Sequence, residues 1–127
     1  MSYYAFEEAM DYPKEFPEHE LACPCCGECH MDDNFLRKLL YARKQAGIPF
    51  PINSGYRCEA HNEAVGSTSR NHFGNAVDIA VTDSWRRVII IAALIKAGFR
   101  RIGIYPTFIH ADNMNEGGSS PEAMWLG

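Results

Sequence analysis

Apolar residues recur at helical spacing in the segment MDDNFLRKLLYARKQAG, residues 31–47. Side chains three and four positions apart share one face of a helix, so this segment predicts an amphipathic helix. We expect Asp32 or Asp33 to cap its start, because a carboxylate there accepts hydrogen bonds from free backbone N–H groups, and Gly47 to end it. The predicted buried face consists of Phe35, Leu36, Leu39, Leu40 and Ala42.

A second helix is predicted over residues 82–99, TDSWRRVIIIAALIKAGF. Asp83 or Ser84 is expected to cap its start, and Gly98 follows its last turn. The apolar run VIIIAALI, residues 88–95, is too short to cross a bilayer, which takes about 20 apolar residues. We therefore expect a buried helix and no membrane insertion.

Shorter segments have the two-residue alternation of strands. In NAVDIAV, residues 75–81, alternation predicts a strand with two different faces. One face would carry Val77, Ile79 and Val81, and the other Ala76, Asp78 and Ala80. The segment 100–113, RRIGIYPTFIHADN, predicts a hairpin that turns at residues 105–107. Its second arm would place on one face Phe108, His110 and Asp112.

The remaining segments complete an α+β fold, a small antiparallel sheet with helices packed on it. Residues 49–57 predict a short strand running into a turn, and residues 58–74 a short helix followed by a loop. A length of 127 residues suits a single domain, residues 1–127. Within it, we expect residues 1–20 to form a short helix or an arm ending near Pro13 or Pro17. Residues 114–127 are expected to be a loop-like tail held down by Trp125.

Composition and charge narrow the classes of function. Apolar residues make up 46% and charged residues 22% of the chain, as in an ordinary globular protein. The net charge of −4 provides no basic surface for a nucleic-acid backbone, so we expect no nucleic-acid partner. The first residues lack a basic start followed by an apolar core, which predicts synthesis in the cytoplasm without a secretory signal. We also expect a monomer.

The chain has five cysteines, four of them in CPCCGEC, residues 23–29, and the fifth at Cys58. An odd count without a secretory signal argues against a disulfide framework. Cys26 and Cys29 have zinc-knuckle spacing, and His30 could join them with Cys23 or Cys25, but no second CxxC follows. Reduced, partly buried thiols are the favoured interpretation. Pairing of Cys58 is expected only in an oxidising compartment, and the acidic balance opposes a nucleic-acid-binding knuckle.

Three side chains have the composition of a catalytic metal site. A lone histidine on a strand is usually structural, but His72, Asp78 and His110 together provide two imidazoles and one carboxylate. Three protein ligands leave a fourth position for water, as in catalytic rather than structural zinc sites. Small alanines beside Asp78 would keep a cleft open next to it.

Three segments resemble the signature motifs of the M15 zinc peptidases: SGYRCEAHN, SRNHFGNAVDIA and GIYPTFIHAD. This family comprises D-alanyl-D-alanine carboxypeptidases and related phage endolysins that cut peptidoglycan peptides. The chain looks most like the short subgroup whose last motif reads HxD, over residues 21–113. The resemblance implies the fold shared by hedgehog and D-alanyl-D-alanine peptidase domains. It also implies a bound Zn²⁺ and a peptidoglycan peptide as substrate.

The resemblance also implies roles for single residues. His72, Asp78 and His110 would bind the zinc ion. Arg57 would point into the cleft and hold a substrate carboxylate or a developing oxyanion, since its guanidinium donates two parallel hydrogen bonds. The alternative for Arg57 is a surface salt bridge. Ser54 and Asn62 would brace the loop.

Two departures from the family pattern leave alternatives open. The pattern SxHxxGxAxD has two residues between histidine and glycine, whereas only Phe73 separates His72 from Gly74. Either the loop is one residue shorter and His72 still binds zinc, which we favour, or Asn71 takes the first ligand position.

The second departure concerns the general base. The positions where relatives carry a histidine or carboxylate before the last ligand hold Thr107 and Phe108. Asp112 is the predicted catalytic residue, with orientation of a histidine as its alternative. Tyr105, predicted to bind substrate, could also supply the proton, as could His61 or Glu59 if the fold brings them near.

The sequence thus predicts a zinc-dependent peptidase, of D,D-carboxypeptidase or L,D-endopeptidase type, that cleaves stem peptides of the bacterial cell wall. It would act as a phage lysin after release through a holin-made hole, or as a component of the virion. The alternative is a catalytically impaired M15-like fold that binds cell wall or serves as a structural module.

Overall fold

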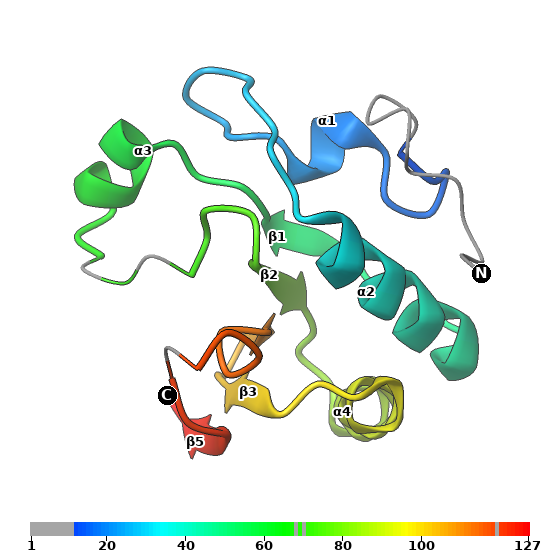
Figure 1. The fold of residues 1–127 in the computed structure, drawn as a ribbon. Coiled ribbons are helices and arrows are strands. Elements are labelled where there is room, and N and C mark those ends of the chain that lie inside the picture. Colours follow the sequence, from blue (N-terminus) through cyan, green and yellow to red (C-terminus); the bar gives the residue numbers. More distant parts are fainter. Residues whose placement is uncertain (1–11, 68, 70, 119) are drawn as a thin grey trace.

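The computed structural model describes residues 12–67, 69, 71–118 and 120–127. Its four helices are α1 Glu18–Leu21, α2 Asp33–Ala46, α3 Glu59–Ala64 and α4 Ser84–Ala97. Its five strands are β1 Ile52–Ser54, β2 Ala76–Ala80, β3 Arg101–Ile104, β4 Phe108–Asp112 and β5 Ala123–Leu126. They form one sheet in the order β1-β2-β4-β3-β5, with α2 and α4 on one side and α3 on the other (Figure 1). The α+β class is confirmed.

Both long helices begin and end where their capping residues predict. The Asp32 side chain accepts a hydrogen bond from the Phe35 backbone N–H at 2.9 Å, and Asp83 accepts one from Arg86 at 3.1 Å. Gly47 and Gly98 follow the last turns in left-handed conformation, which glycine adopts at little cost. Asp32 and Asp83 are therefore the caps, rather than Asp33 and Ser84.

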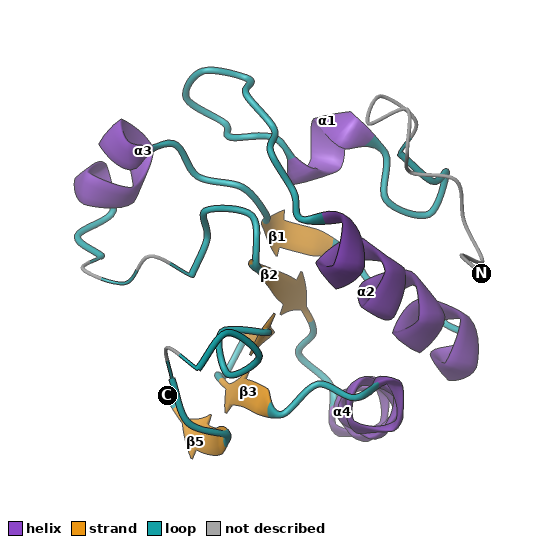
Figure 2. Cartoon of the chain, in the orientation of Figure 1, coloured by secondary structure: helices purple, strands orange, loops and turns teal. Residues whose placement is uncertain are grey.

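The core lies between the sheet and the α2–α4 layer (Figure 2). The predicted apolar face of α2 is buried as a whole, and the β2 residues Val77 and Ile79 point into the same core. Asp78, between them, therefore points to the opposite face of the sheet. That face carries α3 and the loop that returns to β2.

Helix α4 is less buried than its composition predicts. Ile90, Ala93 and Leu94 face the core, whereas Val88 is 66% exposed and Ile95 42% exposed. A helix on the outer layer buries one stripe only, so the expectation of a buried helix holds for one face. No helix within the described parts of the chain is both long and apolar enough to span a membrane.

The predicted loop-like tail is wrong for its last residues, which form β5. This strand runs parallel to β3, with Arg101 opposite Ala123, so the sheet is mixed rather than purely antiparallel. Trp125 does hold the tail down, as predicted. It packs on Gly103, where a Cβ would come 2.6 Å from the indole nitrogen.

The N-terminal arm predicted for residues 1–20 is described only from Tyr12 onward; residues 1–11 lie outside the described part. Phe16 is fully buried in the core and Leu21 closes α1 with no exposed surface. The segment from residue 12 therefore packs on the domain. A helix begins after Pro17 rather than ending near it.

Candidate active site

The three predicted metal ligands meet on the face of the sheet opposite the core. Asp78 on β2 and His110 on β4 are directly paired across the antiparallel ladder, and His72 enters from the loop before β2. His110 Nδ1 lies 2.9 Å from Asp78 Oδ1, and His72 Nε2 lies 3.5 Å from the same oxygen. All three residues are buried, and their possible ligand atoms lie within 4.8 Å of one another. We call them the ligand triad.

His72, and not Asn71, occupies the position of the first ligand. His72 Nδ1 lies 2.8 Å from the Gly55 carbonyl oxygen, so this nitrogen carries the proton and Nε2 is left to face Asp78. The Asn71 amide instead donates to Asp112 Oδ2 at 3.1 Å. Gly74 absorbs the missing residue with a φ of +115°, and a Cβ there would overlap the His30 carbonyl oxygen. The loop therefore brings His72, and not Asn71, to Asp78 and His110, and zinc binding by His72 stays a prediction.

Asp112 lies behind His110, on the side away from Asp78. Its Oδ2 is 2.7 Å from His110 Nε2, which leaves Nδ1 to face the triad. Its Oδ1 accepts hydrogen bonds from Arg101 Nε at 2.8 Å and from the Met114 N–H at 3.0 Å. With 0% exposure, Asp112 offers no oxygen to the cleft. Its geometry is that of a carboxylate that orients a metal-binding histidine, the alternative to the base role predicted for it.

The triad is held by strong internal electrostatics. Burial raises the pKa of Asp78, but its close contacts with His110 and His72 outweigh burial and lower the pKa to about 2. Burial lowers the pKa of His110, but its hydrogen bonds to Asp112 and Asp78 raise the pKa by more than burial lowers it. The net pKa of His110 is therefore raised. His110 thus lies between two carboxylates, and a divalent cation at Nδ1 would add positive charge beside Asp78.

The donor set fits a catalytic zinc ion. Two imidazole nitrogens and one carboxylate oxygen converge, and zinc binds such ligands at about 2.0–2.2 Å. The second nitrogen of each histidine is fixed by a carbonyl or carboxylate, as metal-binding histidines require. The structure thus provides both the ligands and the groups that orient them.

The family model described as Peptidase M15 matches residues 14–112. The chain belongs to the M15 peptidase family. Among curated protein sequences, none matches it significantly. The family supports a metallopeptidase, and the ligand triad is the site where its metal would bind. The match begins near Pro13 and ends at Asp112, so β5 lies beyond it.

Arg57 of this M15 peptidase is fixed beside the triad rather than on the open surface. Its Nε donates to Ser54 Oγ and its Nη1 to Asn62 Oδ1, both at 3.2 Å. Its Nη2 lies 3.7 Å from Asp78 Oδ2, and its side chain is 16% exposed. These contacts agree with a cleft-facing Arg57 braced by Ser54 and Asn62. The surface salt bridge considered as its alternative is not what the structure shows.

A cleft of about 390 Å³ opens over the triad and Arg57. Its opposite wall is aromatic: Tyr105 and Phe108 stack with ring centroids 4.4 Å apart, and Trp125 closes the end. Trp125 Nε1 donates to the Tyr105 hydroxyl at 3.0 Å, so the phenolic proton is free to point elsewhere. Tyr105, predicted to bind substrate, lines this cleft, whereas His61 and Glu59 are not among its described lining residues.

The sequence did not predict the parts that three residues play in this site. Arg101 lies opposite Asp112 in the β3–β4 register, a pairing that the predicted hairpin could have yielded had its register been counted. Asn71 was weighed only as a ligand, and it is a hydrogen-bond donor to Asp112 instead. Trp125 reaches the cleft through β5, for which the sequence carries no alternation that we recognised.

Proposed function

We propose that this M15 peptidase is a zinc-dependent enzyme that cleaves stem peptides of peptidoglycan. The observation that carries the proposal is the buried His72–Asp78–His110 triad at the floor of a cleft that Arg57 also faces. The peptidoglycan substrate and the role as a phage lysin, released through a holin-made hole or carried in the virion, rest on the motif resemblance. The monomeric state stays a prediction.

The residues of the cleft have distinct roles in this proposal. A zinc ion bound by the triad would lower the pKa of a water ligand and polarise the scissile carbonyl. Arg57 holds the carbonyl oxygen as it becomes negative, or the free carboxylate of the substrate. Asp112 keeps His110 turned with Nδ1 toward the cleft. Tyr105, whose hydroxyl accepts from Trp125, would donate its own proton to the leaving amine.

The shape of the cleft supports a small, charged peptide as substrate. A volume of about 390 Å³ is near the lower end of ligand pockets, which suits alanyl side chains better than bulky ones. The guanidinium of Arg57 favours a substrate with a carboxylate close to the scissile bond. Both properties describe the D-alanine end of a stem peptide and its acidic neighbours.

One observation favours the second candidate function, a binding module without turnover. Asp78 is the single carboxylate among the described residues that line the cleft, and it belongs to the triad. If Tyr105 does not deliver the proton, the site would retain metal and peptide without cutting. Such a protein would bind cell wall or serve as a virion component.

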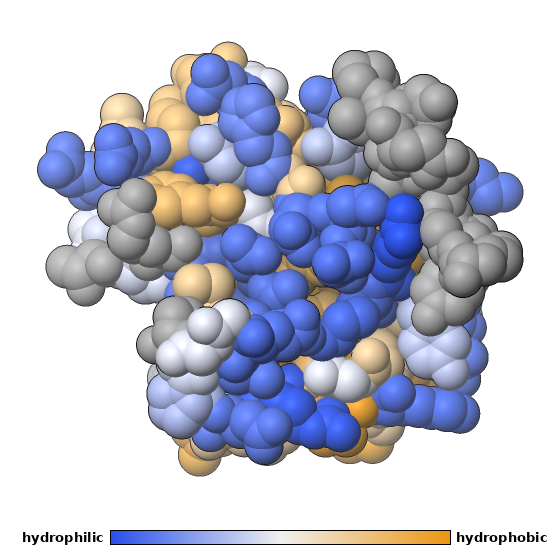
Figure 3. Space-filling view, in the orientation of Figure 1, coloured by the Kyte–Doolittle hydropathy of each residue, from blue (hydrophilic) through white to orange (hydrophobic). Residues whose placement is uncertain are grey.

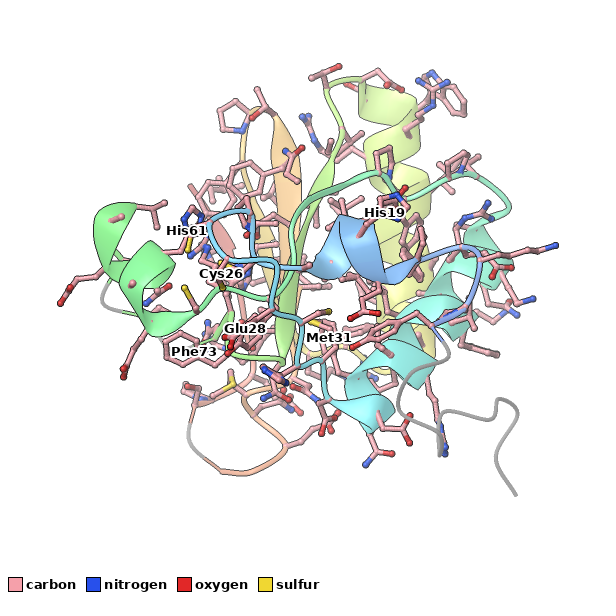
Figure 4. All side chains as sticks on the ribbon, turned by 90° about the horizontal axis from the view of Figure 1, so that it is seen from above. His19, Cys26, Glu28, Met31, His61 and Phe73 are labelled. Carbon is pink, nitrogen blue, oxygen red and sulfur yellow. The ribbon has the colours of Figure 1, made fainter. Side chains whose placement is uncertain are left out.

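The deciding experiment is release of free amines from purified peptidoglycan by zinc-loaded protein, with the products identified by mass spectrometry. We expect amine release by the wild type and none by His110→Ala. The matched control is His19→Ala, which removes an exposed histidine on α1 (Figure 4) and should retain full activity. Metal binding without amine release would favour the binding module, and amine release by His110→Ala would overturn the proposed site.

A further inference from the structure

Four of the five cysteines converge at a second place in the fold. Cys23, Cys25 and Cys26 come from the loop between α1 and α2, and Cys58 comes from the residue that caps α3. Their sulfur atoms all lie within 4.8 Å of one another. We call these four residues the thiol cluster. It is separate from the ligand triad and contributes nothing to the lining of the cleft.

The sulfur–sulfur distances match a shared metal better than a disulfide. Cys25 and Cys58 are 3.2 Å apart, Cys23 and Cys25 are 3.5 Å apart, and Cys23 and Cys58 are 3.6 Å apart. A disulfide requires about 2.05 Å. Four sulfurs at about 2.3 Å from one zinc ion in tetrahedral arrangement lie about 3.8 Å from each other. One disulfide would join only two of the four thiols and would not account for the other two, which lie within 4.8 Å of them.

Backbone hydrogen bonds, rather than any bond between sulfur atoms, bring the cluster cysteines of the loop together. The loop reverses through hydrogen bonds from Gly27 N to Cys23 O and from Cys23 N to Glu28 O, at 2.8 and 2.7 Å. Gly27 has a φ of +80° there, which glycine adopts most readily. This reversal brings three thiols of the loop close to Cys58, and Figure 4 shows Cys26 beside α3.

A second set of contacts brings Cys58 to the loop. The Tyr56 N–H donates to the Leu21 carbonyl at 2.7 Å, and Gly55 lies so close that a Cβ would meet the same carbonyl oxygen at 2.7 Å. The His61 N–H donates to Cys58 Sγ at 3.4 Å, which fixes the direction of this side chain at the start of α3. Two segments more than thirty residues apart in sequence are therefore docked with their thiols face to face.

Cys29 is the internal contrast. Its sulfur lies 3.4 Å from the Tyr12 hydroxyl and takes no part in the cluster. The knuckle spacing of Cys26 and Cys29 is thus not the pair that the fold uses, and His30 packs its ring edge-on against Tyr56 instead. Two cluster thiols, Cys25 and Cys26, are exposed. Figure 3 shows orange, hydrophobic residues at the upper left of the molecule, where the loop between α1 and α2 lies in Figure 1.

We propose that the thiol cluster is a closed structural site for one Zn²⁺, bound by Cys23, Cys25, Cys26 and Cys58. Four thiolates fill the tetrahedral positions, so this ion has no room for water and takes no part in hydrolysis. Its function is to cross-link the loop between α1 and α2 to the start of α3. Arg57 precedes Cys58 directly, and its N–H donates to the His72 carbonyl at 2.7 Å. Zinc binding at Cys58 would therefore hold in place the neighbouring Arg57, whose backbone also bonds to His72.

Metal content of protein purified under reducing conditions tests this site. The two separate ligand groups predict two zinc ions per wild-type chain. His110→Ala should retain the cluster zinc alone, and Cys58→Ser should retain the triad zinc alone. Cys29→Ser, the matched control, should keep both ions.

X-ray absorption on His110→Ala gives a readout that does not depend on the folding of a cysteine variant. We expect a pure sulfur shell at about 2.3 Å from zinc. A zinc-free cluster in reduced protein, nitrogen or oxygen in that shell, or a disulfide joining two of the four cysteines in freshly purified protein would overturn the proposal. Iron at the same site would overturn the assignment to zinc.

Discussion

Replacing Asp112 by asparagine tests whether its carboxylate orients His110 or acts as the catalytic base. The four hydrogen bonds to Asp112 divide evenly, two to each oxygen: Arg101 and Met114 donate to Oδ1, and His110 and Asn71 face Oδ2. Asparagine keeps one oxygen and turns an NH₂ group toward the other two donors. Each buried donor left without an acceptor costs about 1–3 kcal/mol.

We therefore expect Asp112→Asn to lower the free energy of unfolding by about 4 kcal/mol, a large share of the 5–15 kcal/mol typical of a domain. Loss of the charged partner of His110 should also weaken zinc binding at the triad by about 10- to 100-fold. Urea unfolding of zinc-free protein measures the first effect, and competition with a chelator measures the second.

Asp83→Asn is the matched control for Asp112→Asn. Asparagine caps a helix as well as aspartate does, so the free energy of unfolding should change by less than about 0.5 kcal/mol. If Asp112→Asn abolished turnover while zinc affinity and stability stayed at wild-type values, Asp112 would act on the substrate directly, and the orienting role would be refuted.

Three further predictions concern the same site. Gly74→Ala forces a side chain onto the His30 carbonyl at positive φ, so we expect at least about 2 kcal/mol lost in urea unfolding and weaker zinc binding; unchanged zinc affinity would show that the bend does not position His72. Arg57→Lys should lower kcat/KM on a stem peptide by about 10²-fold with zinc content unchanged, and a wild-type rate would remove Arg57 from catalysis. Because the pKa of Asp78 is lowered to about 2, its contribution is present above about pH 4 and lost as pH falls toward 2. Zinc-free protein should therefore lose about 2 kcal/mol over that range and Asp78→Asn should lose less; equal losses would contradict the cause given for the shift.

The elements and the ligand triad were within reach of the sequence. Caps, helical spacing and strand alternation are local properties, and they located α2, α4 and the buried face of β2. The choice between His72 and Asn71 was not local, because it depends on how far Gly74 bends the loop against His30. The role of Asp112 likewise depends on Arg101, which reaches it across the β3–β4 ladder.

The thiol cluster likewise depends on contacts between segments that are distant in sequence. Spacing within CPCCGEC draws attention to Cys26 and Cys29, which are three apart in sequence. The reversal at Gly27 instead gathers Cys23, Cys25 and Cys26, and the docking of residues 55–56 on Leu21 supplies Cys58. No spacing rule predicts a ligand delivered by tertiary packing.

We propose that zinc at the ligand triad makes this chain a peptidase. The most direct test of this proposal is amine release from peptidoglycan while zinc is added back to protein stripped of the triad metal. We expect activity to rise with added zinc and to saturate at one ion per triad, and His110→Ala to stay inactive throughout. Turnover by the stripped protein, or full zinc loading without any turnover, would contradict the proposal.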